Sequence, residues 1–197
     1  MINRRNTEYF GDYIMAGTLS VQKIQGLATS AAPTTVEIAS GHKITGAAGA
    51  IAVPGHVIQV INGPNTASRT AVSSTSYTDT TVTATITPKF ATSKILVRFN
   101  VVVGSAANVY VYLRLMRNIG GGSFSLVNAN EDDTAIDGYP GSWTMIGNEA
   151  LDSPATTSAC TYKVQTKGGT SDTHYVGWTT DTDQKNMMNM TLMEIAQ

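Results

Sequence analysis

A chain of 197 residues with a formal net charge of -1 and a single cysteine has the length for one full domain with an appendage, or for two small domains. One cysteine excludes an intrachain disulfide framework, and the near-neutral charge gives no footprint for nucleic acid or an anionic membrane. Only 14% of the residues are Asp, Glu, Lys or Arg, against about 25% in an average soluble domain, which favours an extracellular structural protein over a cytosolic enzyme.

Residues 1–17 differ in character from the rest of the chain. Charged and aromatic side chains crowd together there, and aromatic side chains would have no use on a solvated tail. We therefore predict an anchor segment that docks on another protein, with a frayed terminus as the alternative. Its candidate contact residues are Arg4, Arg5, Tyr9, Phe10 and Tyr13.

Residues 18–55 consist of short apolar pieces broken by small, turn-forming residues. Such segments hold too few apolar residues to bury themselves alone, which predicts a trimeric stem of strands wrapped against copies of themselves. A flexible linker is the alternative, but it would not need the regularly placed Val and Ile. We predict no metal site apart from one minor hypothesis: His42, repeated around a threefold axis, would supply three nitrogens to an ion.

Residues 56–197 have the pattern of an all-β head domain. Short stretches of alternating apolar and polar residues are separated by Gly, Pro and Asn, and no stretch of useful length has a helical period. Many short alternating strands predict an antiparallel β-sandwich or a barrel. The expected strands are 56–61, 80–87, 94–103, 109–118, 123–128, 143–146, 159–166, 173–180 and 187–195.

The stretch 94–117 presents two different faces at strand period. One face is a continuous set of Ile, Val, Phe and Leu, which indicates a core, whereas the other mixes apolar, Tyr and Arg side chains. Protein interfaces are enriched in Tyr, Met and Arg, so we predict that another copy of the chain covers this face. The alternative is a solvated face on which tyrosines cover arginine stems.

We predict that the last strand belongs to the same interface, with Glu194 as the candidate partner of Arg98 or Arg114. The full set comprises Leu96, Arg98, Tyr110, Tyr112, Arg114, Met116, Met190, Leu192 and Glu194.

Catalytic chemistry finds little support in the sequence. No nucleophile elbow, phosphate-binding loop, dinucleotide fingerprint or zinc-protease motif is present. The stretch "NANEDDTAIDG" fails the calcium-loop pattern, and Cys160 is interpreted as a small buried residue. We predict no enzyme and no cofactor. A glycan depolymerase is the less favoured alternative, with unsupported candidate carboxylates at Asp132, Asp133, Asp137, Glu149 and Asp181.

Two loops carry residues suited to a host receptor. Aromatic rings stack on the C–H faces of sugars while carboxylates accept their hydroxyls, although Trp and Tyr are as often core or interface residues. The candidate receptor-binding residues are Tyr139, Trp143, Trp178 and Asp181.

Three segments, "SSTSYTDTTVTATITPKFATSKILVRFNVVVG", "LDSPATTSACTYKVQTKGG" and "TLMEIAQ", resemble a C-terminal module of bacteriophage tail-fibre proteins that is frequent in cyanophages. The preceding "EIASGHKITGAAGAIAVPGHVIQV" is similar to the stretch that leads into that module. This resemblance implies a homotrimeric β-sandwich head, related to the C1q and tumour-necrosis-factor jelly rolls, at the outer end of an intertwined stem.

The function that the resemblance implies is a virion structural protein, namely a short homotrimeric tail fibre or spike. Residues 1–17 would attach it to a baseplate or another virion protein, and the head would contact a host glycan or surface protein. A capsid-exterior decoration or head fibre is the alternative location. Neither nucleic acid nor membrane insertion is expected.

Overall fold

The computed structural model describes residues 40, 46, 51, 53–64, 69–105, 107–127, 134–138, 141–177 and 188–197, with backbone only for 134–138. The chain divides into two units, Met1–Thr45 and Gly46–Gln197. The predicted anchor, almost all of the predicted stem and His42 lie outside the described residues, so these predictions stay untested.

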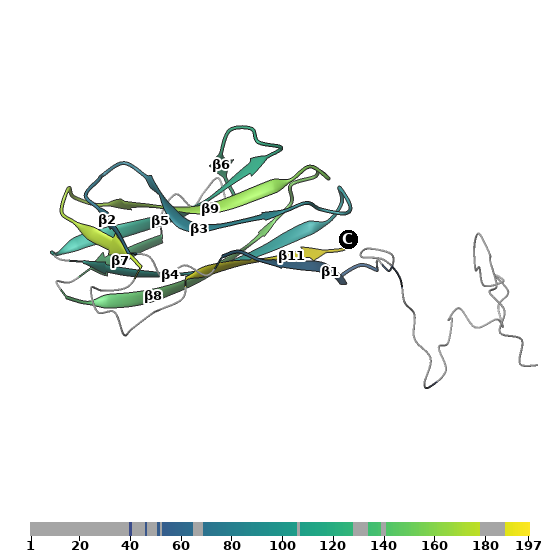
Figure 1. Cartoon of the computed structure of the whole chain (residues 1–197), viewed down its shortest axis with the longest axis horizontal. Coiled ribbons are helices and arrows are strands. Elements are labelled where there is room, and N and C mark those ends of the chain that lie inside the picture. The colour runs from purple at the N-terminus through teal and green to yellow at the C-terminus, as the bar shows by residue number, and fades with distance from the viewer. Residues whose placement is uncertain are drawn as a thin grey trace, which may run out of the picture. The chain divides into compact units, whose positions relative to one another are not determined.

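The described strands form two antiparallel sheets packed face to face, which confirms the all-β sandwich (Figure 1). In the six-stranded sheet the order is β1-β11-β4-β10-β2, and β8 pairs with the other edge of β4. In the five-stranded sheet the order is β3-β9-β5-β6, with β7 also paired to β5. The strands are β1 (Val57–Asn62), β2 (Thr70–Val72), β3 (Thr78–Ile86), β4 (Lys94–Ser105), β5 (Val109–Ile119), β6 (Ser125–Leu126), β7 (Thr134–Gly138), β8 (Trp143–Asp152), β9 (Cys160–Gly168), β10 (His174–Val176) and β11 (Asn189–Ile195).

The core lies between the two sheets and follows the predicted alternation. Successive side chains of a strand point to opposite faces, so every second residue of β4 enters the core. Burying one such side chain stabilises the fold by about 1.5–3 kcal/mol. Val102, at the opposite parity, is buried as well. The core residues from β4 and β5 are Ile95, Val97, Phe99, Val101, Val102, Val103, Val109, Val111 and Leu113. Cys160 is also fully buried, as predicted, and burial raises the pKa of its thiol.

Two strands were not predicted, and one is much longer than expected. The segment β2 has three residues and β7 has five, too few for a clear alternation. The edge strand β8 continues to Asp152 because its residues pair in unbroken register with β4, although Gly147, Asn148 and Glu149 are poor strand formers. Tertiary pairing therefore overrides local propensity in β8.

A buried ion pair joins the two sheets inside the core. The Nη1 of Arg117 on β5 donates to both carboxylate oxygens of Asp152 on β8 at 2.7 Å, and the hydroxyl of Tyr162 on β9 donates to Oδ2 at 2.7 Å. Burial would lower the pKa of Arg117, but Asp152 outweighs it and the net pKa is raised. Burial, and then the bond to Asp152, raises the pKa of Tyr162. These three groups tie β8 to β5 and β9.

A second polar tie holds the crossing from β3 to β4. The carboxylate of Glu194 on β11 is fully buried and accepts a hydrogen bond from Gln59 Nε2 at 2.6 Å. It also accepts from the backbone N–H groups of Lys89 and Phe90, at 2.8 and 3.1 Å. Since β3 and β4 belong to different sheets, these bonds fix the loop that passes between the layers.

Candidate functional site

The outer face of the six-stranded sheet carries an apolar row across four strands. The register places Val60 of β1 beside Met193 of β11, Met193 beside Leu96 of β4, and Leu96 beside Leu151 of β8. We call these four residues the apolar row. Val60 and Leu151, at its two ends, are 54% and 53% exposed. The outer face of this sheet therefore has a contiguous apolar surface that is exposed to solvent.

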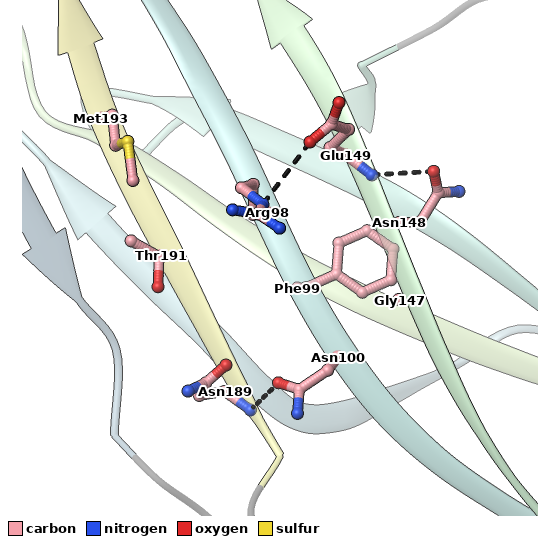
Figure 2. A pocket seen from close by; sticks show the side chains of 9 residues that line it. All are labelled: Arg98, Phe99, Asn100, Gly147, Asn148, Glu149, Asn189, Thr191 and Met193. Atoms are coloured by element: carbon pink, nitrogen blue, oxygen red, sulfur yellow. Dashed lines mark hydrogen bonds and ion pairs between the residues drawn. The ribbon is translucent and has the colours of Figure 1, made fainter.

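A shallow polar hollow of about 480 Å³ adjoins the apolar row (Figure 2). Arg98 and Glu149 point toward each other across it, with Nε and Oε2 3.5 Å apart, and both side chains are more than 60% exposed. The Asn100 amide oxygen accepts from the Asn189 backbone N–H at 2.9 Å. The hollow is lined by Arg98, Phe99, Asn100, Gly147, Asn148, Glu149, Asn189, Thr191 and Met193.

The residues that line this hollow are suited to hydrogen bonding. Its volume falls in the range of small-ligand sites, about 300–1,000 Å³, and amides, a hydroxyl and one ion pair supply both donors and acceptors. A side chain at Gly147 would meet no atom within 4 Å, so the glycine leaves the hollow open. This arrangement suits a polar rim around an apolar contact.

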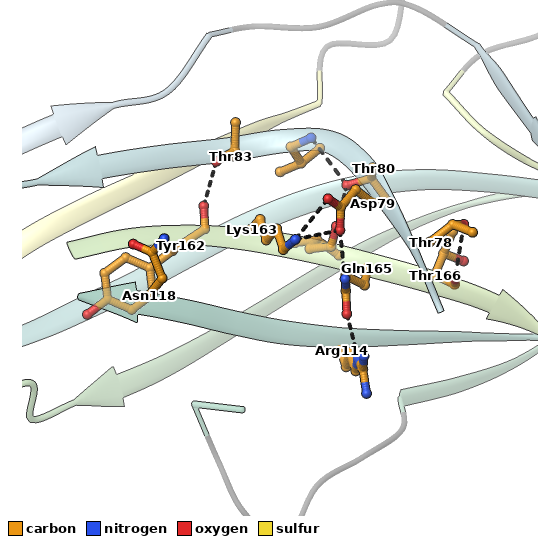
Figure 3. A network of polar contacts seen from close by, with 12 residues as sticks. Thr78, Asp79, Thr80, Thr83, Arg114, Asn118, Tyr162, Lys163, Gln165 and Thr166 are labelled. Atoms are coloured by element: carbon orange, nitrogen blue, oxygen red, sulfur yellow. Dashed lines mark hydrogen bonds and ion pairs between the residues drawn. The ribbon is translucent and has the colours of Figure 1, made fainter. Parts of the chain in front are cut away.

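The outer face of the five-stranded sheet carries a different, cationic surface. Asp79 of β3 accepts from Lys163 Nζ at 2.7 Å and from Gln165 Nε2 at 2.6 Å, and Gln165 in turn accepts from Arg114 Nε at 2.7 Å (Figure 3). The hydrogen bond from Lys163, followed by that from Gln165, holds the pKa of Asp79 below its ordinary value. Asp79, the one anion of this network, is therefore already paired with Lys163 and Gln165.

Aromatic rings lie between the cations on the same face. The guanidinium of Arg114 lies 3.8 Å from the ring centroid of Tyr77. Lys167 Nζ lies between two rings, 4.5 Å from the centroid of Tyr77 and 5.0 Å from that of Tyr112. Tyr110, one pleat further along β5, is 54% exposed. We call Tyr77, Tyr110, Tyr112, Arg114 and Lys167 the cation–tyrosine cluster.

The predicted subunit interface does not form one continuous face, and this part of the prediction is wrong. Leu96 and Arg98 lie on the outer face of the six-stranded sheet, whereas Tyr110, Tyr112 and Arg114 lie on the outer face of the five-stranded sheet. The reason is that the β4–β5 connection crosses between the layers, so the two outer faces point away from each other. Met116 on β5 is 7% exposed and is paired with Leu126 of β6.

The assignment of the last strand to that interface is also corrected. Met190, Leu192 and Glu194 are fully buried, because their register neighbours on β4 are the core residues Phe99, Val97 and Ile95. The outward residues of β11 are the alternate ones. Glu194 consequently pairs with neither predicted arginine: Glu149 pairs with Arg98, and Gln165 with Arg114.

Of the predicted receptor-binding residues, the structure describes only Trp143. Its half-buried indole stacks on Tyr175 with ring centroids 6.0 Å apart, and Arg69 lies 3.7 Å from the Tyr175 centroid. A Cβ at Gly104 would approach the Trp143 ring to 2.3 Å, so this packing requires glycine. Trp143 is therefore engaged in packing. Tyr139, Trp178 and Asp181, together with Asp132 and Asp133, lie outside the described residues.

Sequence reasoning missed several residues that the structure brings together. Val60, Met193 and Leu151 join Leu96, and Tyr77 and Lys167 join Tyr112, only through strand pairing. Alternation showed which residues share a face of one strand, but no signal in the sequence indicated the neighbouring strand. Within the described residues no cluster of three or more metal-ligating side chains occurs, and no helix there is long and apolar enough to cross a membrane.

The burial of His174 predicts that the stability of the fold depends on pH. Its imidazole is fully buried, Nε2 lies 3.1 Å from Thr166 Oγ1, and Nδ1 has no partner among the described residues. Burial lowers the pKa of His174, so the unfolded chain takes up the proton first. Stability is then complete above about pH 6.5 and falls below it, by up to about 1.4 kcal/mol at pH 5.5.

Chemical denaturation of the wild type and His174→Gln at pH 8 and pH 5.5 tests this pH dependence. In His174→Gln, the part of the difference in unfolding free energy between the two pH values that comes from His174 should disappear. His56→Gln changes an exposed histidine and should keep the wild-type difference. Equal pH dependence in the wild type and His174→Gln would contradict the assignment.

Comparison with known proteins gives no family. No family model matches the chain, and no curated protein matches it. Among solved structures, a chain of infectious bursal disease virus, Gt strain, is 10% identical with a TM-score of 0.39, covering 71% of this chain and 38% of that chain. The Gx strain gives 9% identity and a TM-score of 0.38, covering 71% and 37%. This chain thus spans less than two-fifths of the length of the viral chains.

Proposed function

We propose that this chain is a virion structural protein: the head, stem and anchor of a short homotrimeric phage tail fibre or spike, with the six-stranded sheets facing the threefold axis. The observation that carries the proposal is the apolar row on the outer face of that sheet. The resemblance of the sequence to tail-fibre modules supplies the expected number of subunits and the location on the phage.

The distribution of exposed apolar residues supports this orientation. Among the described residues, eight large hydrophobic side chains are exposed. Four of them, Val57, Val60, Met145 and Leu151, lie on the border strands β1 and β8 of the six-stranded sheet. An exposed apolar patch rimmed by polar residues is typical of a protein interface, and Arg98 and Glu149 provide part of that rim. Three copies around an axis would bury the row in each subunit.

Light scattering on the purified protein tests the subunit contact. We expect the mass of three chains for the wild type and of one chain for Val60→Glu/Leu151→Glu, because two carboxylates would have to be buried in each contact. Thr85→Glu/Ser125→Glu adds the same charge on the five-stranded sheet and should remain trimeric. A monomeric wild type, or a trimeric Val60→Glu/Leu151→Glu variant, would contradict the proposal.

Immunogold labelling of intact particles tests the location. Label at the tail is the expected result, with residues 1–17 as the attachment to a baseplate or adaptor protein. Label distributed over the capsid would instead favour a decoration protein built on the same sandwich, and absence of label from particles would exclude both.

A further inference from the structure

We infer that the cation–tyrosine cluster on the outer face of the five-stranded sheet binds a carboxylate-bearing glycan. The inference rests on the proposed function in one respect: it names the ligand class of the surface that would contact the host. The cluster is separate from the apolar row, which lies on the opposite sheet.

The guanidinium of Arg114 is held in place before any ligand arrives. Its Nε donates to Gln165 Oε1 at 2.7 Å, and its plane lies against Tyr77, 3.8 Å from the ring centroid. The two terminal nitrogens make no hydrogen bond to a described residue. The edge formed by these two terminal nitrogens matches a carboxylate through two parallel hydrogen bonds, and fixing the guanidinium in advance lowers the entropy lost on binding.

The outward charges among the described side chains of this face are mostly positive. Arg114, Lys163 and Lys167 point outward from β5 and β9, and the described side chains include one outward carboxylate near them, Asp79, which Lys163 and Gln165 already engage. The carboxylate subsite is therefore at Arg114, and Tyr110 lies two outward positions away along β5.

The aromatic residues indicate a sugar rather than an acidic peptide. Tyr110 is 54% exposed and offers a ring face to the C–H groups of a pyranose. Gly169 lies beside both tyrosines. A Cβ at Gly169 would crowd them, since it would lie 3.3 Å from Tyr110 Cβ and 3.4 Å from Tyr112 Cε2. An extended peptide would pair with the edge of a sheet, whereas this cluster lies on the flat face. Four residues of strand separate Tyr110 from Arg114 by about 13 Å, so the ring and the carboxylate site would hold different units of one uronic-acid polymer.

Calorimetric titration of the full chain with polygalacturonate is the direct test. We expect saturable binding that weakens as salt is raised, and no binding of neutral dextran. Arg114→Lys keeps the charge but loses the paired hydrogen bonds, so we expect about tenfold weaker binding. Tyr110→Ala changes an exposed residue and should also weaken binding, without loss of folding. Lys89→Gln removes one positive charge elsewhere and should bind as the wild type does.

Each outcome bears on the inference. Equal affinity of wild type, Arg114→Lys and Tyr110→Ala for the polymer, or equal binding of poly-glutamate and polygalacturonate, would overturn the glycan site. Thermal melts of each variant identify any loss of binding that comes from unfolding, and Tyr110→Ala remains decisive if Arg114→Lys is unstable. Light scattering on the same samples separates the two proposals: a trimer without binding refutes only the glycan site, and a binding monomer refutes only the subunit contact.

Discussion

Asp152→Ala is expected to lower the free energy of unfolding by about 3–5 kcal/mol, the cost of breaking a buried ion pair by removal of one partner. The Arg117 and Asp152 side chains are 19% and 7% exposed. Water can therefore replace few of the hydrogen bonds that the carboxylate accepts. The variant would leave the Arg117 guanidinium without its anion and the buried Tyr162 hydroxyl without its acceptor. Denaturant unfolding at fixed protein concentration measures the loss.

A matched control for this prediction exists on the outer face of the same sheet. Arg98 and Glu149 also join β4 to β8, but their side chains are 62% and 64% exposed. Exposed pairs contribute about 0–1 kcal/mol, so Glu149→Gln should change stability by no more than that. Arg117→Met/Asp152→Leu should recover much of the loss because no buried charge remains. Similar losses for Asp152→Ala and Glu149→Gln would show that burial does not determine the strength of these pairs.

The sequence was sufficient for the fold class because each long strand carries its own alternation. On β4 the residues Ile95, Val97 and Phe99 face inward as predicted. The last strand was assigned the wrong face because "MNMTLMEIA" has apolar residues at both parities, and Glu194 appeared too polar for a core. A change of one position in parity exchanges the two faces of a strand, so this one choice misplaced Met190 and Leu192 together.

The predicted interface residues lie on two opposite faces for a different reason. The stretch from β4 to β5 has the pattern of a hairpin, and a hairpin would have kept Arg98 and Tyr112 on one surface. In the structure the short connection passes from one sheet to the other, because β4 pairs with β8 and β5 pairs with β9. These partners are distant in the sequence. The local sequence does not specify these pairings. Neighbours on other strands, such as Leu151 and Lys167, could therefore not be predicted.

On the proposed function, the two outer faces would make two different kinds of contact. One face presents the apolar row with a polar rim, as expected for contact with identical subunits, and the other presents fixed cations and tyrosine rings, as expected for contact with an anionic ligand. If the six-stranded sheets face the threefold axis, the five-stranded sheets must face outward, since the two lie on opposite sides of one core. A trimer of this kind would present three copies of the cation–tyrosine cluster, and several weak sites on one particle bind with high avidity.

Glu194→Ala is expected to destabilise the sandwich by about 2–5 kcal/mol, through two partly buried N–H groups left without their acceptor and the volume lost with the side chain. Both N–H groups, from Lys89 and Phe90, belong to the loop that passes from β3 to β4, so the variant should also loosen that crossing. Hydrogen exchange at these two amides measures the local effect, and denaturant unfolding measures the global one.

Glu194→Gln separates the role of the acceptor from that of the charge. The amide oxygen of glutamine can still accept from the loop, and Gln59 can turn its own amide to accept from the new NH2 group, so the loss should be about 1–2 kcal/mol, less than for alanine. Were Glu194 part of an intersubunit ion pair, as its sequence position suggested, both variants would change the mass of the assembly and leave the loop amides protected. Because Glu194 lies wholly inside one chain, we expect unprotected amides in the alanine variant and an unchanged subunit count in the glutamine variant.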